Sequence, residues 1–205
     1  MKHFCYILSL FAFLIFLDSC SEKNEAGEYD NWKERNQHYV DSIASLADAG
    51  TDGWTKLLAY KYLEPADGSG GKKNHYVYIQ KLASGSGKEY PKYNDSIRVH
   101  YLGRLIPSAS YEQGFVFGKS YSSYVLDDKT DVPALMGVNN TVIGYATAVM
   151  NMVEGDRWKI VIPYSIGYGS GSNSSKTIPA YSTLIFDLQL ARIYRYKIDT
   201  DTTWH

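Results

Sequence analysis

In the C-terminal two thirds of the chain, apolar and polar residues tend to alternate, the pattern of strands that bury one face. In the stretch 96–106, Ile97 and Val99 would face one side of a sheet and Arg98 the other. The same alternation recurs near the C-terminus, in TLIFDLQLARIY. The pattern predicts five strands, over residues 75–83, 96–106, 115–121, 157–163 and 183–194.

Two other stretches have the spacing of apolar residues that marks an amphipathic helix. The first follows Asn31 and Glu34, which have the spacing of a capping box, and ends before Gly50. This helix could lie on the domain or on a neighbouring molecule. The second covers 144–155, where Gly155 would end it. Several antiparallel strands with one short helix among them predict an α+β fold, in which a curled antiparallel sheet wraps around that helix and an N-terminal helical extension precedes it.

The first residues have the pattern of a bacterial export signal. A short basic start precedes an apolar run, residues 4–17, that is too short to span a membrane comfortably. The run ends in Leu-Asp-Ser-Cys, which is similar to a lipobox, although Asp18 departs from the small neutral residue preferred there. We expect Cys20 to be acylated and the protein to be lipid-anchored in the cell envelope, with Ser21 favouring the outer membrane. A plain secretory signal and an N-terminal membrane anchor are the alternatives.

The composition narrows the classes of partner and of chemistry. Lys and Arg number 21 against 22 Asp and Glu, with no basic stripe, so nucleic acid is not expected as a partner. Cys5 and Cys20 are the two cysteines, and both belong to the signal region, which leaves the folded part without a disulfide or a thiol nucleophile. Tyrosine is frequent, at 19 residues, and its apolar ring with one polar end suits a pocket or a binding face.

The common catalytic and metal-binding motifs are absent from the sequence. GFVFGKS at 114–120 has three residues where a phosphate-binding loop needs four between its first glycine and the Gly-Lys pair. The five histidines are scattered without metal-ligand spacing, and no serine stands in a Gly-x-Ser-x-Gly turn. Asp127, Asp128 and Asp131 stand around Lys129 and are most simply a solvated loop. We therefore expect no nucleotide, no metal ion and no cofactor.

The second half of the chain carries five aromatic and apolar motifs in a fixed order. They are VHYLGRLI (99–106), the Phe117 region, TVIGYATAVMNMVEGDRWKIVIP (141–163), IGYG (166–169) and TIPAYSTLIFDLQL (177–190). In order and spacing these motifs resemble the FKBP-type peptidyl-prolyl isomerases, and the resemblance covers residues 95–194. It implies the family's fold, an antiparallel sheet around a short helix. The chain then divides into a lipoprotein signal peptide (1–19), a tether (20–30), a helical extension (31–74) and an FKBP-like domain (75–205).

The resemblance also implies a proline pocket and the residues that build it. Carried over by position, the backbone N–H of Val142 would hold the substrate carbonyl, and the hydroxyl of Tyr168 would hydrogen-bond a bound carbonyl. The rings of Phe117 and Phe186 complete the set implied to be catalytic. The residues implied to bind the substrate are Tyr101, Thr141, Tyr145, Ile178 and Tyr181. The Gly/Ser segment 169–177 corresponds to the family's flap over the pocket.

We expect a peptidyl-prolyl cis-trans isomerase of the cell envelope that acts on proline-containing protein clients in a desolvated aromatic pocket. Two positions depart from the family pattern. Gly118 stands where the family has an acidic residue, and Tyr145 replaces the tryptophan of the pocket floor. The missing acidic residue at 118 supports the alternative of a non-catalytic FKBP-like lipoprotein that holds prolyl or apolar segments of an envelope partner. A purely structural lipoprotein is the third hypothesis.

Overall fold

The computed structural model describes residues 27–62, 71–123, 125–127, 130–173 and 175–196. The chain divides into two units, residues 1–30 and residues 31–205. The predicted signal peptide, the lipidation site Cys20 and most of the predicted tether lie outside the described residues. Within the described ranges, no helix is both long enough and apolar enough to cross a membrane.

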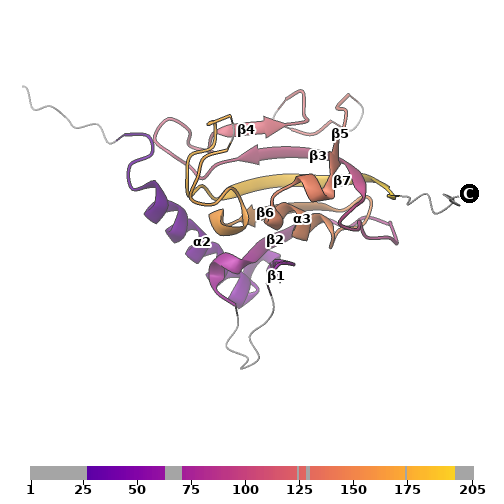
Figure 1. Cartoon of the computed structure of the whole chain (residues 1–205), viewed down its shortest axis with the longest axis horizontal. Helices are drawn as coiled ribbons and strands as arrows, with labels where there is room; N and C mark the ends of the chain where they lie inside the picture. The colour runs from indigo at the N-terminus through magenta and orange to yellow at the C-terminus, as the bar shows by residue number, and fades with distance from the viewer. Residues whose placement is uncertain (1–26, 63–70, 124, 128–129, 174, 197–205) are drawn as a thin grey trace, which may run out of the picture. The chain divides into compact units, whose positions relative to one another are not determined.

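The described residues of the second unit form two α-helices and seven strands (Figure 1). The helices are α2 (Trp32–Ala49) and α3 (Ile143–Val149). The strands are β1 (Trp54–Leu58), β2 (Tyr76–Ala83), β3 (Ser96–Arg104), β4 (Val116–Lys119), β5 (Ala134–Gly137), β6 (Arg157–Ile162) and β7 (Leu184–Tyr194). Short 3-10 turns cover Thr51–Gly53, Lys73–His75, Val138–Asn140 and Tyr164–Ile166.

These strands make one antiparallel sheet in the order β1-β2-β6-β7-β3-β4, with β5 also paired to β3. Strand β7 is central and pairs with β3 on one side and with β6 on the other. The pairing of β3 shifts in register between Arg98 and Val99 and again between Gly103 and Arg104, and such irregularities increase the bend and twist of a strand. The sheet and its helix confirm the predicted α+β fold.

The five predicted strands are present with slightly different limits, and two more strands join them. Residues 54–58, inside the predicted helical extension (31–74), form β1 and pair along their whole length with β2, so this part of the segment is a strand of the sheet. Residues 134–137 form β5 against the first half of β3. Both strands are short and lack a clear alternation of apolar and polar residues, which is why the pattern does not predict them.

Helix α3 packs closely on the sheet because its second residue is glycine. A Cβ on Gly144 would lie 2.4 Å from Cγ2 of Ile162 on β6, a distance that real contacts do not reach. The helix ends at Val149 rather than at the predicted Gly155, because the N–H groups after Met150 bond to carbonyls three residues back instead of four. Gly155 lies further on, in a left-handed conformation (φ 94°), and its N–H bonds to β7.

Helix α2 lies on the other face of the β1–β2–β6 part of the sheet. Its buried residues Val40, Ile43 and Ala44 pack with Trp54, Tyr76, Tyr78 and Val161. The alternate residues of the same strands, Val77, Ile79, Ile160 and Ile162, pack in the cluster that contains α3. Because successive strand residues point to opposite faces, the two helices cover opposite faces of the sheet.

The ends of α2 match the sequence prediction only in part. Gly50 ends the helix in a left-handed conformation (φ 63°), and its N–H bonds to the carbonyls of Leu46 and Ala47, as a C-terminal glycine allows. The predicted capping box is wrong. Asn31 is itself left-handed (φ 51°), and its side chain makes no capping hydrogen bond.

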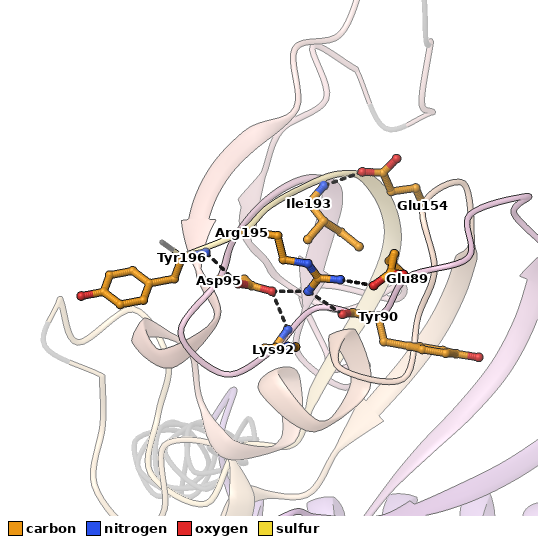
Figure 2. Close-up of polar contacts among 8 residues, drawn as sticks. All are labelled: Glu89, Tyr90, Lys92, Asp95, Glu154, Ile193, Arg195 and Tyr196. Atoms are coloured by element: carbon orange, nitrogen blue, oxygen red, sulfur yellow. Dashed lines mark hydrogen bonds and ion pairs between the residues drawn. The ribbon is translucent and has the colours of Figure 1, made fainter. Parts of the chain in front are cut away.

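A cluster of charged residues, Arg195, Asp95 and Glu89, connects the C-terminal end of β7 to the segment before β3 (Figure 2). The guanidinium of Arg195 lies between Asp95, at 2.6 Å, and Glu89, at 2.7 Å. The buried Asp95 carboxylate also accepts the backbone N–H groups of Lys92 (2.7 Å) and Tyr196 (2.9 Å). Burial alone would raise the pKa of Asp95, but these N–H groups and the guanidinium outweigh it and lower the pKa below its ordinary value.

Candidate functional site

A cavity of about 480 Å³ opens beside the N-terminus of α3, which is within the size range of small-ligand sites, about 300–1,000 Å³. Strands β3, β4, β5 and β7, the first turn of α3 and the described residues of the flap (169–173 and 175–177) supply its walls. The lining residues are Tyr101, Phe117, Gly118, Met136, Asn140, Thr141, Val142, Tyr145, Tyr168, Asn173, Ser175, Thr177, Ile178, Leu184 and Phe186. None of these described lining residues carries a charge.

The ring of Phe186, on β7, is the centre of the aromatic wall. Tyr145 on α3 meets it edge to face, with ring centroids 5.2 Å apart, and Phe117 on β4 does the same at 5.4 Å. Tyr101 on β3 lies tilted to it at 6.4 Å. Edge-to-face contacts at these distances are favourable, so each ring is held by its neighbours. Four residues from four separate elements thus form a rigid apolar surface.

Gly103 on β3 makes this arrangement possible. A Cβ at this position would lie 2.6 Å from Cε2 of Phe117 and 2.8 Å from Cε1 of Phe186. Both rings would have to shift to accept even a methyl group. The absence of a side chain at Gly103 is therefore part of the geometry of the aromatic wall.

The floor residue Tyr145 has a buried hydroxyl that makes no hydrogen bond to any described residue. Burial raises the pKa of Tyr145, and its neighbours Tyr101 and Tyr121 act in the same direction. Burial likewise raises the pKa of Tyr101, with a smaller effect from Tyr168. Both phenols therefore stay protonated at physiological pH, and the cavity is neutral.

A backbone N–H without a partner among the described residues lies at the start of α3, at Val142, which lines the cavity. Val142 precedes the helix in an extended conformation, and its carbonyl accepts the N–H of Ala146 at 3.0 Å. Among the described residues, no group accepts a hydrogen bond from the N–H of Val142 itself. The adjacent Thr141 turns its hydroxyl to the carbonyl of Val138, at 2.8 Å, so its side chain is already occupied.

The flap is organised by the side chain of Asn173. Its Oδ1 accepts the backbone N–H of Ile178 at 2.9 Å, and its Nδ2 donates to the hydroxyls of Ser175 and Thr177 at 2.8 and 3.0 Å. Lys176 adopts a left-handed conformation (φ 56°) within this turn, and its N–H bonds to the carbonyl of Asn173. A loop rich in glycine and serine thus has a defined shape on the side that faces the cavity.

The structure brings eight of the nine predicted site residues to this one cavity. They are Tyr101, Phe117, Thr141, Val142, Tyr145, Tyr168, Ile178 and Phe186. Tyr168 is exposed at the cavity mouth, whereas Tyr145 and Ile178 are buried.

Tyr181 is the predicted residue that does not line the cavity. Its backbone is left-handed (φ 62°), and its ring packs edge to face on Tyr164, with centroids 5.3 Å apart. The ammonium of Lys33 lies 4.9 Å from the centre of the same ring. The ring therefore points to α2 and to the turn after β6, and its predicted role in substrate binding is not supported.

Other residues that line the cavity are not predicted from the sequence. Met136 lies on the unpredicted strand β5, and Asn140 follows in the turn after it. Asn173, Ser175 and Thr177 belong to the predicted flap, but no pattern distinguishes them from the other polar residues there. Of the described flap residues, these three line the cavity.

Gly118 leaves room beside the hydroxyl of Tyr101. A Cβ built at this position would lie 3.4 Å from both Cε2 and Oη of Tyr101, which is an ordinary contact. A methyl group here would thus sit next to the phenol without a clash. Among the described residues, no group of three or more His, Cys, Asp or Glu is placed to hold a metal ion.

Comparison with known proteins identifies the family. A family model described as FKBP-type peptidyl-prolyl cis-trans isomerase matches residues 87–191, just over half of the chain. The macrophage infectivity potentiator of Trypanosoma cruzi is 35% identical over 117 residues, which are 57% of this chain and 53% of that protein. The FK506-binding protein of Neisseria meningitidis serogroup B is 34% identical over 118 residues, which are 58% of this chain and 96% of that protein.

A solved structure shows the same fold. The crystal structure of a peptidyl-prolyl cis-trans isomerase from Pseudomonas syringae pv. tomato superposes with a TM-score of 0.53 and 21% identity, covering 80% of this chain and 96% of that one. The chain spans about half the length of the first curated relatives that it matches, 53% and 48%. The match of the family model, together with these relatives, confirms the predicted resemblance: the chain belongs to the FKBP-type peptidyl-prolyl cis-trans isomerase family.

Proposed function

We propose that this protein is a peptidyl-prolyl cis-trans isomerase whose substrate binds in the neutral aromatic cavity. The proline ring enters between Phe117, Tyr145 and Phe186, and the hydroxyl of Tyr168 and the N–H of Val142 bind carbonyl groups of the peptide. Family membership supports the activity. The binding of the proline in this cavity rests on one observation. The rings around Phe186 are held against one another beside the N–H of Val142, which has no acceptor among the described residues.

The proposed mechanism needs no nucleophile. Rotation about a prolyl amide faces a barrier of about 18–20 kcal/mol, which comes from resonance between nitrogen and carbonyl. The planar amide carries separated charge that water stabilises, and the twisted amide carries less. A cavity lined by rings and without charged side chains stabilises the planar form less than water does, so it favours the twisted form by comparison. Every 1.36 kcal/mol of this difference accelerates rotation about tenfold.

Exchange NMR on a short proline-containing peptide tests the proposal. Wild type should accelerate the cis-trans exchange, and Phe186→Ala should remove most of the acceleration, because it empties the centre of the wall. Tyr168→Phe should reduce kcat/KM about two- to tenfold, the loss of one hydrogen bond to the substrate. Tyr194→Phe, an exposed tyrosine at the far end of β7, is the matched control and should be silent. No acceleration by wild type would end the proposal.

Gly118 favours a second candidate, a non-catalytic module that binds prolyl or apolar segments of an envelope partner. The acidic residue that the family resemblance places here is missing, while the cavity around it is intact. A Cβ at this position would meet Tyr101 at ordinary contact distance. If wild type binds a proline peptide without accelerating exchange and Gly118→Asp gains activity, the binding module is the better account. Equal activity of the two proteins favours the enzyme.

The location in the cell envelope is also a proposal, supported by the N-terminal sequence alone. Acylation of Cys20 would tether the domain to a membrane, where its clients would be proline-containing proteins of that compartment. Expression of the full chain in a bacterium fed with labelled palmitate should label wild type. Cys20→Ala should remain unlabelled and be released into the soluble fraction. Labelling of the alanine variant would contradict the proposal.

A further inference from the structure

Helix α2, which precedes the segment matched by the family model, reaches the chain that leaves the flap. Trp32, the first residue of the helix, is buried, and its indole Nε1 donates to the hydroxyl of Ser182 at 2.8 Å. The same hydroxyl donates to the carbonyl of Pro179 at 2.7 Å. Indole, hydroxyl and carbonyl thus form a chain of two hydrogen bonds between residues about 150 positions apart in the sequence.

A second buried contact lies one turn further along α2. Asn36 is fully buried, and its Oδ1 accepts the backbone N–H of Thr183 at 2.7 Å. Its Nδ2 donates to the carbonyl of Trp32 at 2.6 Å, which fixes the orientation of the amide. Because an unpaired buried N–H costs about 1–3 kcal/mol, this contact restrains the backbone at Thr183 to a narrow range of positions.

The segment that α2 holds, residues 179–183, lies between two residues of the cavity wall. Ile178 precedes it and Leu184 follows it, and both line the cavity. Within it, the N–H of Tyr181 bonds to the carbonyl of Gly169 at 3.0 Å and so closes the base of the flap. A displacement of this short segment would therefore move two walls and the flap together.

We propose that α2 positions the cavity wall and the flap for substrate binding, with Trp32 and Asn36 as its positioning residues. Neither residue lines the cavity, and both act through Ser182 and Thr183. The role rests on the proposed isomerase function of the same cavity. Buried, mutually satisfied hydrogen bonds hold supporting residues in one arrangement, and a binding site depends on such support for its precision.

Two mild variants remove the first contact from either side. Trp32→Phe keeps an aromatic ring in the core but loses the N–H donor. Ser182→Ala removes the acceptor and, with it, the hydrogen bond to the carbonyl of Pro179. The double variant completes a mutant cycle. Val40→Ala is the matched control, since Val40 lies on α2 and is equally buried but packs against the sheet with Trp54 and Tyr78, away from the flap. Wild type and the four variants are compared as full chains, well below their melting temperatures.

The expected result is a rise of about two- to tenfold in KM for a proline peptide in each single variant, with kcat within about twofold, because binding in ground state and transition state weakens equally. The double variant should be no worse than the poorer single one. The amides of Tyr181 and Thr183 should exchange with deuterium about fivefold faster than in wild type, the effect of losing one hydrogen bond. Val40→Ala should lower the melting temperature and change neither KM nor these two exchange rates.

The hydrogen-exchange measurement separates this inference from the proposed activity. If wild type does not accelerate the cis-trans exchange of the peptide, the proposed isomerase function fails. The deuterium-exchange rates of the amides and the affinity for the peptide, measured by NMR titration, still decide the role of α2. Unchanged amide rates in Trp32→Phe and Ser182→Ala would overturn the inference. So would faster amide exchange without any change in KM or peptide affinity, or an identical response of Val40→Ala.

Discussion

The rings of Phe186 and Tyr145 meet edge to face, with centroids 5.2 Å apart and planes inclined by 77°. One comes from the central strand β7 and the other from α3, so this contact joins the sheet to the helix at the bottom of the cavity. The hydroxyl of Tyr145 lies beyond the contact, buried and without a hydrogen bond to a described residue. The ring of Tyr145 thus stabilises the floor of the cavity, whereas its buried hydroxyl, which has no partner among the described residues, destabilises the folded protein.

Tyr145→Phe should therefore stabilise the protein. The variant keeps the edge-to-face contact with Phe186 and removes a buried hydroxyl that lost its hydration without gaining a partner, which should raise the free energy of unfolding by about 1 kcal/mol. Urea denaturation measures the change. Tyr78→Phe is the matched control: Tyr78 is also buried, but its hydroxyl donates to the carbonyl of Lys73 at 2.9 Å, so its removal should destabilise. Destabilisation by Tyr145→Phe would show that the hydroxyl has a partner in solution.

Gly103→Ala should disturb the aromatic wall. The new methyl group would lie within 2.8 Å of both Phe117 and Phe186, so the rings must move or the strands must separate. We expect a loss of about 1–3 kcal/mol in the free energy of unfolding, typical of overpacking, together with weaker binding of a proline peptide. Thermal denaturation and NMR titration measure the two effects.

The control for this prediction is Gly118→Ala. Gly118 pairs with Gly103 across β3 and β4, and a methyl group there meets only ordinary contacts. Gly118→Ala should therefore leave the free energy of unfolding nearly unchanged. Both variants replace a glycine by alanine, so the difference between them reports the overpacking and not the loss of backbone flexibility. Equal stability of both variants would mean that the rings yield more easily than the structure indicates.

The buried carboxylate of Asp95 should make the free energy of unfolding fall at acidic pH. The N–H groups of Lys92 and Tyr196 and the guanidinium of Arg195 lower the pKa of Asp95 in the folded protein despite its burial. The unfolded chain then binds more protons in acid than the folded chain does. The contribution of this carboxylate is complete above its unfolded pKa, about 3.9, and is lost as the pH falls through the lower folded value.

Asp95→Asn tests this contribution. The variant should lose about 2 kcal/mol of unfolding free energy at pH 7, since charge-assisted hydrogen bonds are stronger than neutral ones, and its stability should fall less steeply than that of wild type below pH of about 4. Urea denaturation at a series of pH values measures both. Asp48→Asn breaks an exposed pair with Lys56 and should change stability by less than about 1 kcal/mol. Parallel acid profiles of wild type and Asp95→Asn would contradict the assignment.

Much of the fold follows from local pattern. In β7, Leu184, Phe186 and Leu188 are buried while the residues between them are only partly so, and the sequence alternates in the same way. The cavity residues follow from family resemblance, because the motifs that carry them lie in strands and helix ends whose positions the fold determines. The prediction for α2 succeeds at Gly50, where backbone geometry requires a residue tolerant of positive φ.

The features that sequence does not predict depend on long-range contacts. Trp54–Leu58 is a strand because β2 lies beside it, and no alternation within those five residues indicates this. Asn31 has a residue type that favours caps, but its left-handed backbone turns the side chain away from that role. The ring of Tyr181 is directed by its own positive φ and by Tyr164, neither of which can be read from its place after the flap.

Asn173 holds the flap through three side-chain hydrogen bonds. Asn173→Ala removes all of them and leaves the N–H of Ile178 without its acceptor. Because the flap then samples more conformations, ordering it over the substrate costs more, and we expect the affinity for a proline peptide to fall about fivefold or more. NMR titration measures the affinity, and amide hydrogen exchange measures the order of the flap.

Asn173→Asp grades the effect. The carboxylate keeps the acceptor for Ile178 but has no N–H donors, so the hydroxyls of Ser175 and Thr177, which also bond to each other at 2.9 Å, must turn to donate to it. Its affinity should therefore lie between those of wild type and Asn173→Ala. An intermediate value would show that the backbone contact to Ile178 and the hydroxyl contacts each contribute to closing the cavity. If Asn173→Ala binds as well as wild type while its flap amides exchange faster, the order of the flap does not govern affinity, and the aromatic wall alone retains the substrate.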